Sequence, residues 1–326
     1  MHNEYSHKIK SENFEKRIDG LKELFPNSVL LASLNEKDKN VDLNISINLS
    51  EISIDDILSL QSELSLHNTA CEAAYLLYSK YKNEWLIKLI NCENIQLLAK
   101  EVSAHIESLS ALHRKLKRLL SFSFIKIEKS EINENNSLKK ILEFLIYGKT
   151  VIVQFGNNYS TLSYLLISNI LTRMLYKKIF SGVTERKTEQ IVIVIEEAHK
   201  FLHPSIASQT PFGMISREMR KYGISLLIVD QRPSQIDNEV LSQISTKFIL
   251  NMTDEKDILA ALSGAPQVQN LKKLLEENNN NQEALLISHV VSFPCLIKTL
   301  TYDFEFCKNL KNNEFLKEIS EEALYF

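Results

Sequence analysis

Glycine is scarce in this chain, and its scarcity limits the phosphate-binding loops that the sequence can form. The 326 residues include 7 Gly. A loop of the form G-x-x-x-x-G-K-[ST] needs glycines at fixed spacing, between a strand and a helix N-terminus. Gly148-Lys149-Thr150 matches its end, but Glu143 stands where the first glycine should be, in an apolar helix-like run. We therefore predict a turn ahead of a buried strand at 151–155, and no other glycine pair has the required spacing.

Paired cysteines, a membrane-length apolar segment and a strong net charge are also lacking. The 4 Cys form no C-x-x-C, so neither a zinc site nor a disulfide framework is indicated. The densest apolar stretch, 284–297, is broken by Pro294 and polar residues, so we expect no membrane span. The polar N-terminus argues against a secretory signal, and we expect a cytoplasmic protein with reduced thiols. A net charge of −3 gives no global basic signature, although a local basic surface for DNA stays possible.

Changes in sequence pattern predict four segments. Two short strands are expected near the N-terminus, at 28–32 and 42–48. The segments are 1–50, a partial N-terminal part of an α/β core; 51–122, an all-helical insertion; 123–305, the main α/β core; and 306–326, a C-terminal helical tail.

The insertion is helical by its apolar periodicity. Ser53 with Asp56 forms an N-cap box ahead of an apolar face. Further helices are expected at 70–82 and 94–120.

From about residue 138, helix-like and strand-like segments alternate. Continuous Ile/Val runs between helices indicate parallel strands buried on both faces, and such sheets place ligands at the carboxyl ends of the strands. The expected helices are 138–146, 160–180, 213–221, 238–243 and a short terminal helix in 309–326; the expected strands are 151–155, 191–195, 224–229, 247–251, 284–288 and 296–301.

Two consecutive carboxylates follow the apolar run 191–195. Glu196 and Glu197 stand where an ATPase needs one acid to hold magnesium through water and another to orient and deprotonate the attacking water. A strand ending in two solvated acids is the structural alternative. This Walker B-like strand has no phosphate loop to accompany it in the sequence.

Basic and polar residues near the following strand are further candidates. Arg217 and Arg220 precede the strand 224–229, and an arginine at a subunit boundary can stabilise charge on a γ-phosphate. The alternative is a solvated helix end favoured by the helix dipole. Gln231 follows the same strand and could contact the γ-phosphate or the attacking water, or mark an ordinary strand exit.

Two further features favour structural roles. The basic stretch 113–118 could meet DNA phosphates, but a solvated helix face is the favoured interpretation. His199 is favoured as a structural hydrogen-bonding group at the strand tip rather than a ligand.

Three segments in this order resemble the HerA-like branch of the HerA/FtsK superfamily, hexameric RecA-like ATPases that pump DNA. The matching stretches are IVIVIEEAHKFLHP (191–204), SREMRKYGISLLIVDQRPSQIDNEVLSQISTKFILNMTDEKDI (216–258) and EALLISHVVSFPCLIK (283–298). The second is the most specific, because it combines a basic stretch before a strand with Q-R-P-S after it. The resemblance is good from about residue 140 to the end and weaker over the helical region.

The resemblance implies a RecA-like P-loop ATPase core with a mainly parallel sheet. It implies Mg-ATP as the energy source, double-stranded DNA as the substrate, a homo-oligomeric ring, expected to be a hexamer, and a nuclease partner in end resection or phage defence. Glu196 and Glu197 match the Walker B pair, Gln231 the polar sensor, and Arg217 and Arg220 the motif that supplies an arginine. The choice between the two arginines stays open.

The N-terminus bears on whether the chain hydrolyses ATP. Met1-His2-Asn3-Glu4-Tyr5 resembles the family's D-x-H-G-E-Y segment, which lies after the phosphate loop, so we expect the chain to lack that loop. The segment 154–156 also departs from the family, which often has Asp-Leu-Ser there. We therefore expect no hydrolysis by the chain alone. The alternatives are an inactive ring or scaffold subunit, or one half of a split motor.

Overall fold

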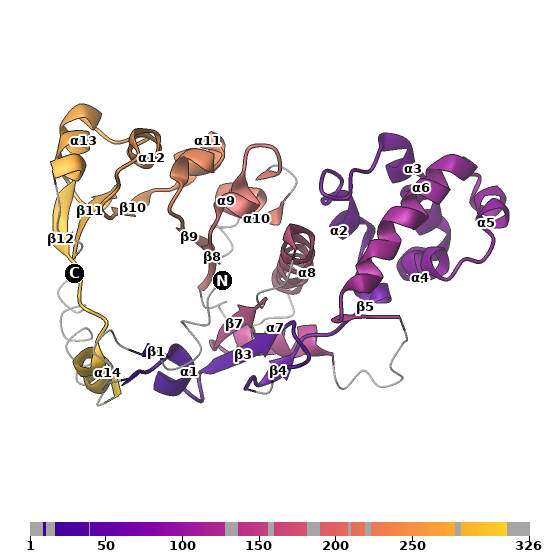
Figure 1. Ribbon diagram of the computed structural model, residues 1–326, viewed down its shortest axis with the longest axis horizontal. Coiled ribbons are helices and arrows are strands. Elements are labelled where there is room, and N and C mark those ends of the chain that lie inside the picture. Colours follow the sequence, from indigo (N-terminus) through magenta and orange to yellow (C-terminus); the bar gives the residue numbers. More distant parts are fainter. Residues whose placement is uncertain are drawn as a thin grey trace.

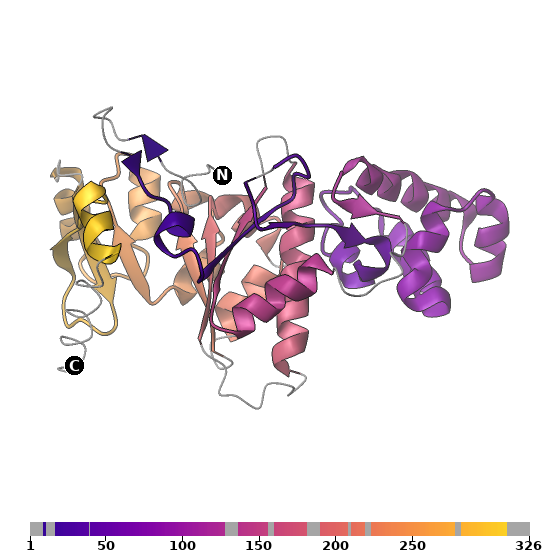
Figure 2. The ribbon, with the colours of Figure 1, turned by 90° about the horizontal axis from the view of Figure 1, so that it is seen from below.

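The chain folds into three parts that lie in a row. Figures 1 and 2 both show a helical insertion at one end, a small sheet with its helices at the other, and parallel strands between them. None of the helices that the structure describes has the length and apolarity to cross a bilayer. The structure is a computed structural model, and it describes residues 9–10, 17–38, 40–127, 136–155, 160–180, 190–207, 210–218, 223–277 and 282–311.

The apolar interior of the helical insertion is continuous with that of the α/β part. The predicted N-cap box at Ser53 is confirmed, since the Ser53 N–H donates to Asp56 Oδ2 at 2.8 Å and Ser53 Oγ accepts from the Asp56 N–H. Trp85 is fully buried at its centre. The elements are α2 (Ile54–Leu58), α3 (Asn68–Tyr81), α4 (Trp85–Ile90), α5 (Ile95–Val102) and α6 (Ile106–Leu116), with 3-10 turns at Leu49–Glu51, Lys82–Glu84 and Lys117–Ser121.

The prediction of one helix over 94–120 is wrong. The chain breaks at Ser103, which has φ 56°, in the left-handed region, and caps the end of α5. A new helix, α6, begins at Ile106. The break lets α5 and α6 pack on each other, so Val102 and Leu109 both become buried in the same core.

A buried ion pair joins the insertion to the long helix α8 (Thr161–Phe180). The Arg173 guanidinium donates to both Asp56 oxygens, at 2.8 Å from Nε and 2.7 Å from Nη2, and also to the Glu51 carbonyl at 2.9 Å. The Asp56 side chain is 2% exposed. Asn169 Nδ2 adds a bond to Ser59 Oγ at 2.6 Å. These contacts fix the insertion to the core.

The first parallel sheet has the order β4-β3-β7. The predicted strand 28–32 is confirmed as β3 (Val29–Ser33), which is buried throughout, and 151–155 as β7 (Thr150–Gln154). β7 is half-buried rather than buried, because β3 is its only strand partner among the described residues. The helix α7 (Ser137–Ile146) precedes β7.

The segment predicted as one strand at 42–48 is two strands, β4 (Leu43–Asn44) and β5 (Ile47–Asn48). Ser137 causes the interruption, since its Oγ accepts from the Ser46 N–H at 3.0 Å and donates to the Ser46 carbonyl at 2.8 Å. β4 pairs with β3, whereas β5 pairs with β6 (Ile125–Lys126).

The strands β8 (Ile191–Glu196) and β9 (Ile224–Val229) form a parallel pair, in the predicted positions. The prediction that both faces are buried is wrong for this pair. One face carries apolar side chains that stay largely exposed, because no described element covers them: Val192 (56%), Val194 (56%), Leu227 (47%) and Val229 (45%). We call these four residues the uncovered face.

The elements around this pair also match the predicted order. α10 begins at Pro211, slightly before the predicted helix start, and the helix at 238–243 is confirmed. The elements are α9 (His199–Leu202), α10 (Pro211–Glu218), a 3-10 turn at Pro233–Gln235 and α11 (Asn238–Gln243).

The strands at the far end are antiparallel, so the expectation of parallel strands is wrong there. β10 (Thr246–Ile249), β11 (Glu283–Ser288) and β12 (Cys295–Lys298) form one sheet in this order. The short link between β11 and β12 permits only a hairpin, because a parallel crossover needs a dozen or more residues. α12 (Glu255–Ala261) and α13 (Val268–Glu277) supply a second small core against this sheet.

The C-terminal helix packs beside the N-terminal part of the chain. α14 (Phe304–Lys311) starts before the predicted 309–326, of which residues 312–326 lie outside the described residues. Tyr302 Oη donates to the Asp19 carbonyl at 2.9 Å, and Lys311 forms an ion pair with Asp19. Figure 1 shows α14 close to α1 (Leu21–Leu24). In the chain, α1 follows the short strands β1 (Ile9–Lys10) and β2 (Arg17–Ile18).

Candidate nucleotide-hydrolysis site

The two predicted carboxylates lie at the carboxyl end of β8. Glu196 is the last residue of the strand and is half-buried, while Glu197 follows it and is exposed. Because side chains alternate along a strand, Glu196 belongs to the same face as Val192 and Val194. A metal-binding acid therefore sits on the uncovered face.

The backbone of Glu197 is strained. Its φ is 50°, in the left-handed region that a residue with a side chain seldom adopts. The Lys200 N–H donates to the Glu197 carbonyl at 2.9 Å and closes the turn. Strain of this kind costs about 1–3 kcal/mol and is concentrated at functional sites, where the surroundings hold it.

Lys200 also contacts the Glu197 side chain. Its Nζ lies 2.5 Å from Glu197 Oε2. The hydrogen bond from Lys200, with the positive charges of Lys200 and His199 beside it, lowers the pKa of Glu197 against a smaller opposing effect of burial. The carboxylate therefore stays ionised to lower pH than an unpaired glutamate would.

Asp230 joins the loops that follow the two strands. Its Oδ2 accepts from the His199 N–H at 2.7 Å and lies 2.9 Å from His199 Nδ1, and its Oδ1 accepts from the Arg232 N–H at 2.6 Å. The expected structural role of His199 is confirmed by these contacts.

The candidate residues are brought together only in part. β8 and β9 pair from Ile191 with Ile224 to Glu196 with Val229, so Gln231 lies at the same edge as the two glutamates and is exposed. Arg217 lies on α10, but its side chain is outside the described part, and Arg220 is outside it altogether. The role of either arginine stays a prediction.

The Gly148 turn is not a phosphate loop. As predicted, it joins α7 to β7: Gly148 has φ 71°, and the Lys149 N–H donates back to the Phe144 carbonyl at 3.0 Å. Lys149 Nζ lies over the Phe144 ring, 4.9 Å from its centroid. The N–H groups therefore close a helix end and do not converge on an anion.

The described residues fit one side of a Mg-ATP site. Glu196 and Glu197 suit a hydrated cation and an attacking water, because hard cations prefer carboxylate oxygen. No group of three or more His, Cys, Asp or Glu capable of enclosing a metal occurs among the described residues, so phosphate oxygens and water would have to complete the coordination. Met1 to Tyr5, the segment resembling the family's post-loop motif, lies outside these residues.

The basic stretch 113–118 divides between core and surface. His113 is half-buried in α6, and partial burial, with Lys117 nearby, lowers the pKa of its imidazole. Lys115 Nζ donates to the Ser65 carbonyl at 2.8 Å. Arg114, Lys117 and Arg118 are exposed, as both a solvated face and a DNA contact would require, so the choice stays a prediction.

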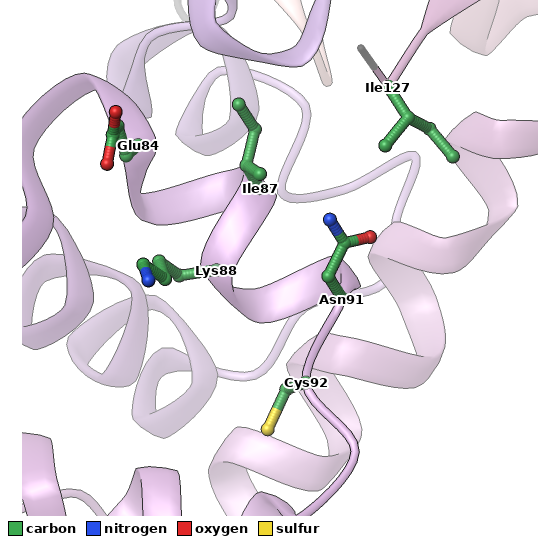
Figure 3. Close-up of a pocket in the computed structure, with 6 residues that line it drawn as sticks. All are labelled: Glu84, Ile87, Lys88, Asn91, Cys92 and Ile127. Atoms are coloured by element: carbon green, nitrogen blue, oxygen red, sulfur yellow. The ribbon is translucent and has the colours of Figure 1, made fainter.

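A pocket of ≈ 560 Å³ lies in the helical insertion, away from the strand tips. Figure 3 shows side chains from α4 and from the residues directly before and after it, with Ile127 beyond β6 on the other side. Its lining is Glu84, Ile87, Lys88, Asn91, Cys92 and Ile127. It holds neither the carboxylates nor Gln231, so it is not part of the candidate site.

Sequence reasoning missed Lys200 and the role of Asp230. The contact of Lys200 could have been predicted, because Lys200 follows Glu197 by three residues at the start of the helix α9, and side chains three residues apart on a helix are neighbours. Asp230 had none, because its partner His199 is 31 residues away along the chain.

Known proteins resemble the chain over part of its length. No family model matches it. It is 33% identical over 153 residues to the DNA double-strand break repair helicase HerA of Sulfurisphaera tokodaii, covering 43% of this chain and 30% of that protein. It is 38% identical over 116 residues to HerA of Saccharolobus solfataricus, covering 33% and 22%. The chain thus spans less than a third of the length of these two relatives.

A solved structure supports the fold. VirB4 of Thermoanaerobacter pseudethanolicus superposes with a TM-score of 0.50 over 88% of this chain and 85% of that one, at 17% identity. Such a likeness concerns the fold alone. With the HerA relatives it confirms the resemblance to the HerA/FtsK superfamily and the predicted α/β, RecA-like core.

Proposed function

We propose that this chain supplies the magnesium and water-activating half of a HerA-like, ATP-driven motor that moves double-stranded DNA. The observation that carries the proposal is the shared edge of β8 and β9, where Glu196, Glu197 and Gln231 lie together. The sequence relatives are DNA repair helicases, which supports DNA as the substrate. The working assembly would be a ring of copies, with a hexamer and a nuclease partner as further parts of the proposal.

Each residue has a definite task in this scheme. Glu196 binds the water shell of the cation, and Glu197 takes a proton from the attacking water. Magnesium, when bound, neutralises charge on the β- and γ-phosphates. Gln231 contacts the γ-phosphate or orients the water. Arg217 or Arg220 of a neighbouring copy would stabilise charge on the transferring phosphoryl group.

The phosphates themselves need a second element. Without a glycine-rich loop and its lysine, few groups bind the β- and γ-phosphates. The uncovered face supports the proposal that the phosphate-binding element comes from another part of the motor, because four apolar side chains around Glu196 stay largely exposed. An element that brings phosphates to Glu196 would have to cover Val194 and Leu227 as it does so.

An inactive ring or scaffold subunit is the competing function. The absence of a phosphate loop from the sequence favours it. The strained backbone of Glu197, closed by the Lys200 N–H and held across from Asp230 through His199, favours the catalytic alternative, because strain of this kind is concentrated at functional sites.

ATP hydrolysis measured on two preparations tests the proposal. The purified chain alone should give no Mg-ATP turnover above background. The second preparation, called the loop-completed protein, is the chain together with a polypeptide that carries G-x-x-x-x-G-K-[ST] from a HerA relative, either linked in sequence or added separately. It should hydrolyse ATP, and double-stranded DNA should stimulate the hydrolysis. Glu197→Gln should abolish turnover while ATP binding persists.

Two results would contradict the proposal. Robust hydrolysis by the chain alone, abolished by Glu197→Gln, would remove the need for a second element. Loop-completed protein that binds ATP but never hydrolyses it would leave the scaffold function.

A further inference from the structure

We infer that Asp230 is a positioning residue that fixes Glu197 relative to Gln231 by joining the two strand tips. This inference rests on the proposed hydrolytic function and assigns a role to a residue outside the nucleotide-contacting set.

The Asp230 carboxylate is nearly inaccessible to water. Its side chain is 3% exposed, although it lies at the edge of the sheet directly after β9. A buried carboxylate is costly unless hydrogen bonds satisfy its oxygens. Here both oxygens accept from backbone N–H groups, one from His199 and one from Arg232.

These two bonds reach the two loops that carry the proposed reacting groups. His199 follows Glu197 by two residues, and Arg232 directly follows Gln231. The bond to Arg232 is a local turn of the kind that Asp often makes with the second residue on. The bond to His199 crosses from the end of β9 to the loop after β8, so one carboxylate sets the separation of the loops.

The strained backbone of Glu197 explains why such a contact is needed. At φ 50°, Glu197 would relax to a commoner conformation unless its neighbours were held. Lys200 closes the turn from its own loop, and Asp230 holds the His199 N–H from the other strand. Loss of the Asp230 bond would let the Glu197 carboxylate move away from the water it deprotonates.

A carboxylate is required for both bonds. An asparagine presents one acceptor oxygen and an NH₂ group, which cannot accept from a second N–H. A serine can preserve the local turn with Arg232 but is too short to reach across to His199. Asp230→Asn and Asp230→Ser therefore weaken the hydrogen-bonded link between the two loops in different ways. The serine variant leaves no buried charge.

The chain offers a matched control in Asp254. Its Oδ1 also accepts from two backbone N–H groups, those of Lys256 and Asp257, where it caps α12. Because both bonds reach the same oxygen, Asp254→Asn should keep them, so it tests the exchange of a carboxylate for an amide at an exposed cap elsewhere in the molecule. A loss shared by both substitutions would be a loss of folding, and a loss confined to Asp230 would concern the site.

The first measurement is steady-state ATP hydrolysis by the loop-completed protein. Asp230→Asn and Asp230→Ser should each lower kcat at least about tenfold with KM for ATP within about threefold, because small misplacements of a reacting group cost up to about a hundredfold. Asp254→Asn should leave kcat within about twofold, since surface and remote caps act on stability. Either Asp230 variant with the kcat of the unmodified protein would overturn the inference.

The second measurement needs no activity. Backbone amide exchange in the full chain, read by NMR, should accelerate at one of the two amides, His199 or Arg232, in Asp230→Asn, because asparagine keeps one acceptor oxygen, and at His199 alone in Asp230→Ser. Amides inside β8 should be unchanged. Unaltered exchange at His199 in Asp230→Ser would overturn the inference. If the unmodified, loop-completed protein shows no hydrolysis, the proposed function fails, and exchange at His199 still decides whether Asp230 holds the loop.

Discussion

Lys200 Nζ lies 2.5 Å from Glu197 Oε2, so the proposed base is paired with a cation from its own loop. The pair lowers the pKa of Glu197 and keeps the carboxylate ionised. It also limits basicity, because a carboxylate of lower pKa accepts a proton less readily. If Glu197 is the base, as proposed, the ion pair keeps it ionised to lower pH at a cost in proton affinity.

Lys200→Ala should raise the pKa of Glu197. A lowered carboxyl pKa contributes stability above its unfolded value, and that contribution is lost as pH falls through the folded value. In the variant, turnover by loop-completed protein should begin to fall at a higher pH on the acid side. The measurement is the Glu197 side-chain carbon titration by NMR, together with the pH profile of kcat.

Lys80→Ala is the control, because Lys80 pairs with Glu101 in the helical insertion and should not affect Glu197. An unchanged Glu197 titration in Lys200→Ala would mean that the ion pair does not persist in solution.

Arg173→Met should destabilise the junction between α8 and the helical insertion. It leaves the Asp56 carboxylate buried and without its cation, and breaking a buried pair in this way costs about 3–5 kcal/mol. Urea unfolding followed by Trp85 fluorescence measures this, because the chain has 1 Trp and it lies inside the insertion. Lys80→Ala, at an exposed pair, should cost less than about 1 kcal/mol. A similarly small loss in Arg173→Met would refute the structural role of the pair.

Sequence patterns predicted the elements better than their arrangement. The apolar runs at β8 and β9 and the capping residues Ser53 and Asp56 are local signals, and the structure confirms them. The antiparallel direction of β12 follows from its short link to β11, a signal that the predicted strands 284–288 and 296–301 already contain and that the parallel prediction did not use. The Asp230 contact with His199 depends on tertiary packing of two strands, so no spacing rule could identify it.

Ser103 tests why the predicted long helix breaks. Its left-handed backbone suits glycine, so Ser103→Gly should be neutral or stabilise the protein by up to about 1 kcal/mol. Ser103→Val should destabilise it by more than about 1 kcal/mol, because a β-branched residue is a genuine outlier at positive φ. Thermal unfolding of the two variants measures the difference. Equal stability would mean that α5 and α6 join differently in solution.

Side chains of the uncovered face should contribute to assembly with a second element and little to the stability of the chain. Val194 is 56% exposed in the chain, so Val194→Thr should change its free energy of unfolding by less than about 0.5 kcal/mol. Ile195 belongs to the opposite face and is 4% exposed, so Ile195→Thr should cost about 2 kcal/mol or more through lost packing and a buried hydroxyl.

Binding of the loop polypeptide should depend on the exposed side chains that the stability of the chain does not need. If the element that carries the phosphate loop covers Val194 and Leu227, then Val194→Thr and Leu227→Thr should raise the concentration of a separately added loop polypeptide needed for half-maximal ATP hydrolysis. Ser225 belongs to the same face by register but offers no apolar side chain, so Ser225→Ala should leave that concentration unchanged or lower it. Hydrolysis that responds equally to all three substitutions would show that the loop docks elsewhere. In that case the exposure of Val194 and Leu227 would need a different partner, such as a second copy of the chain, which sedimentation of the same variants would detect.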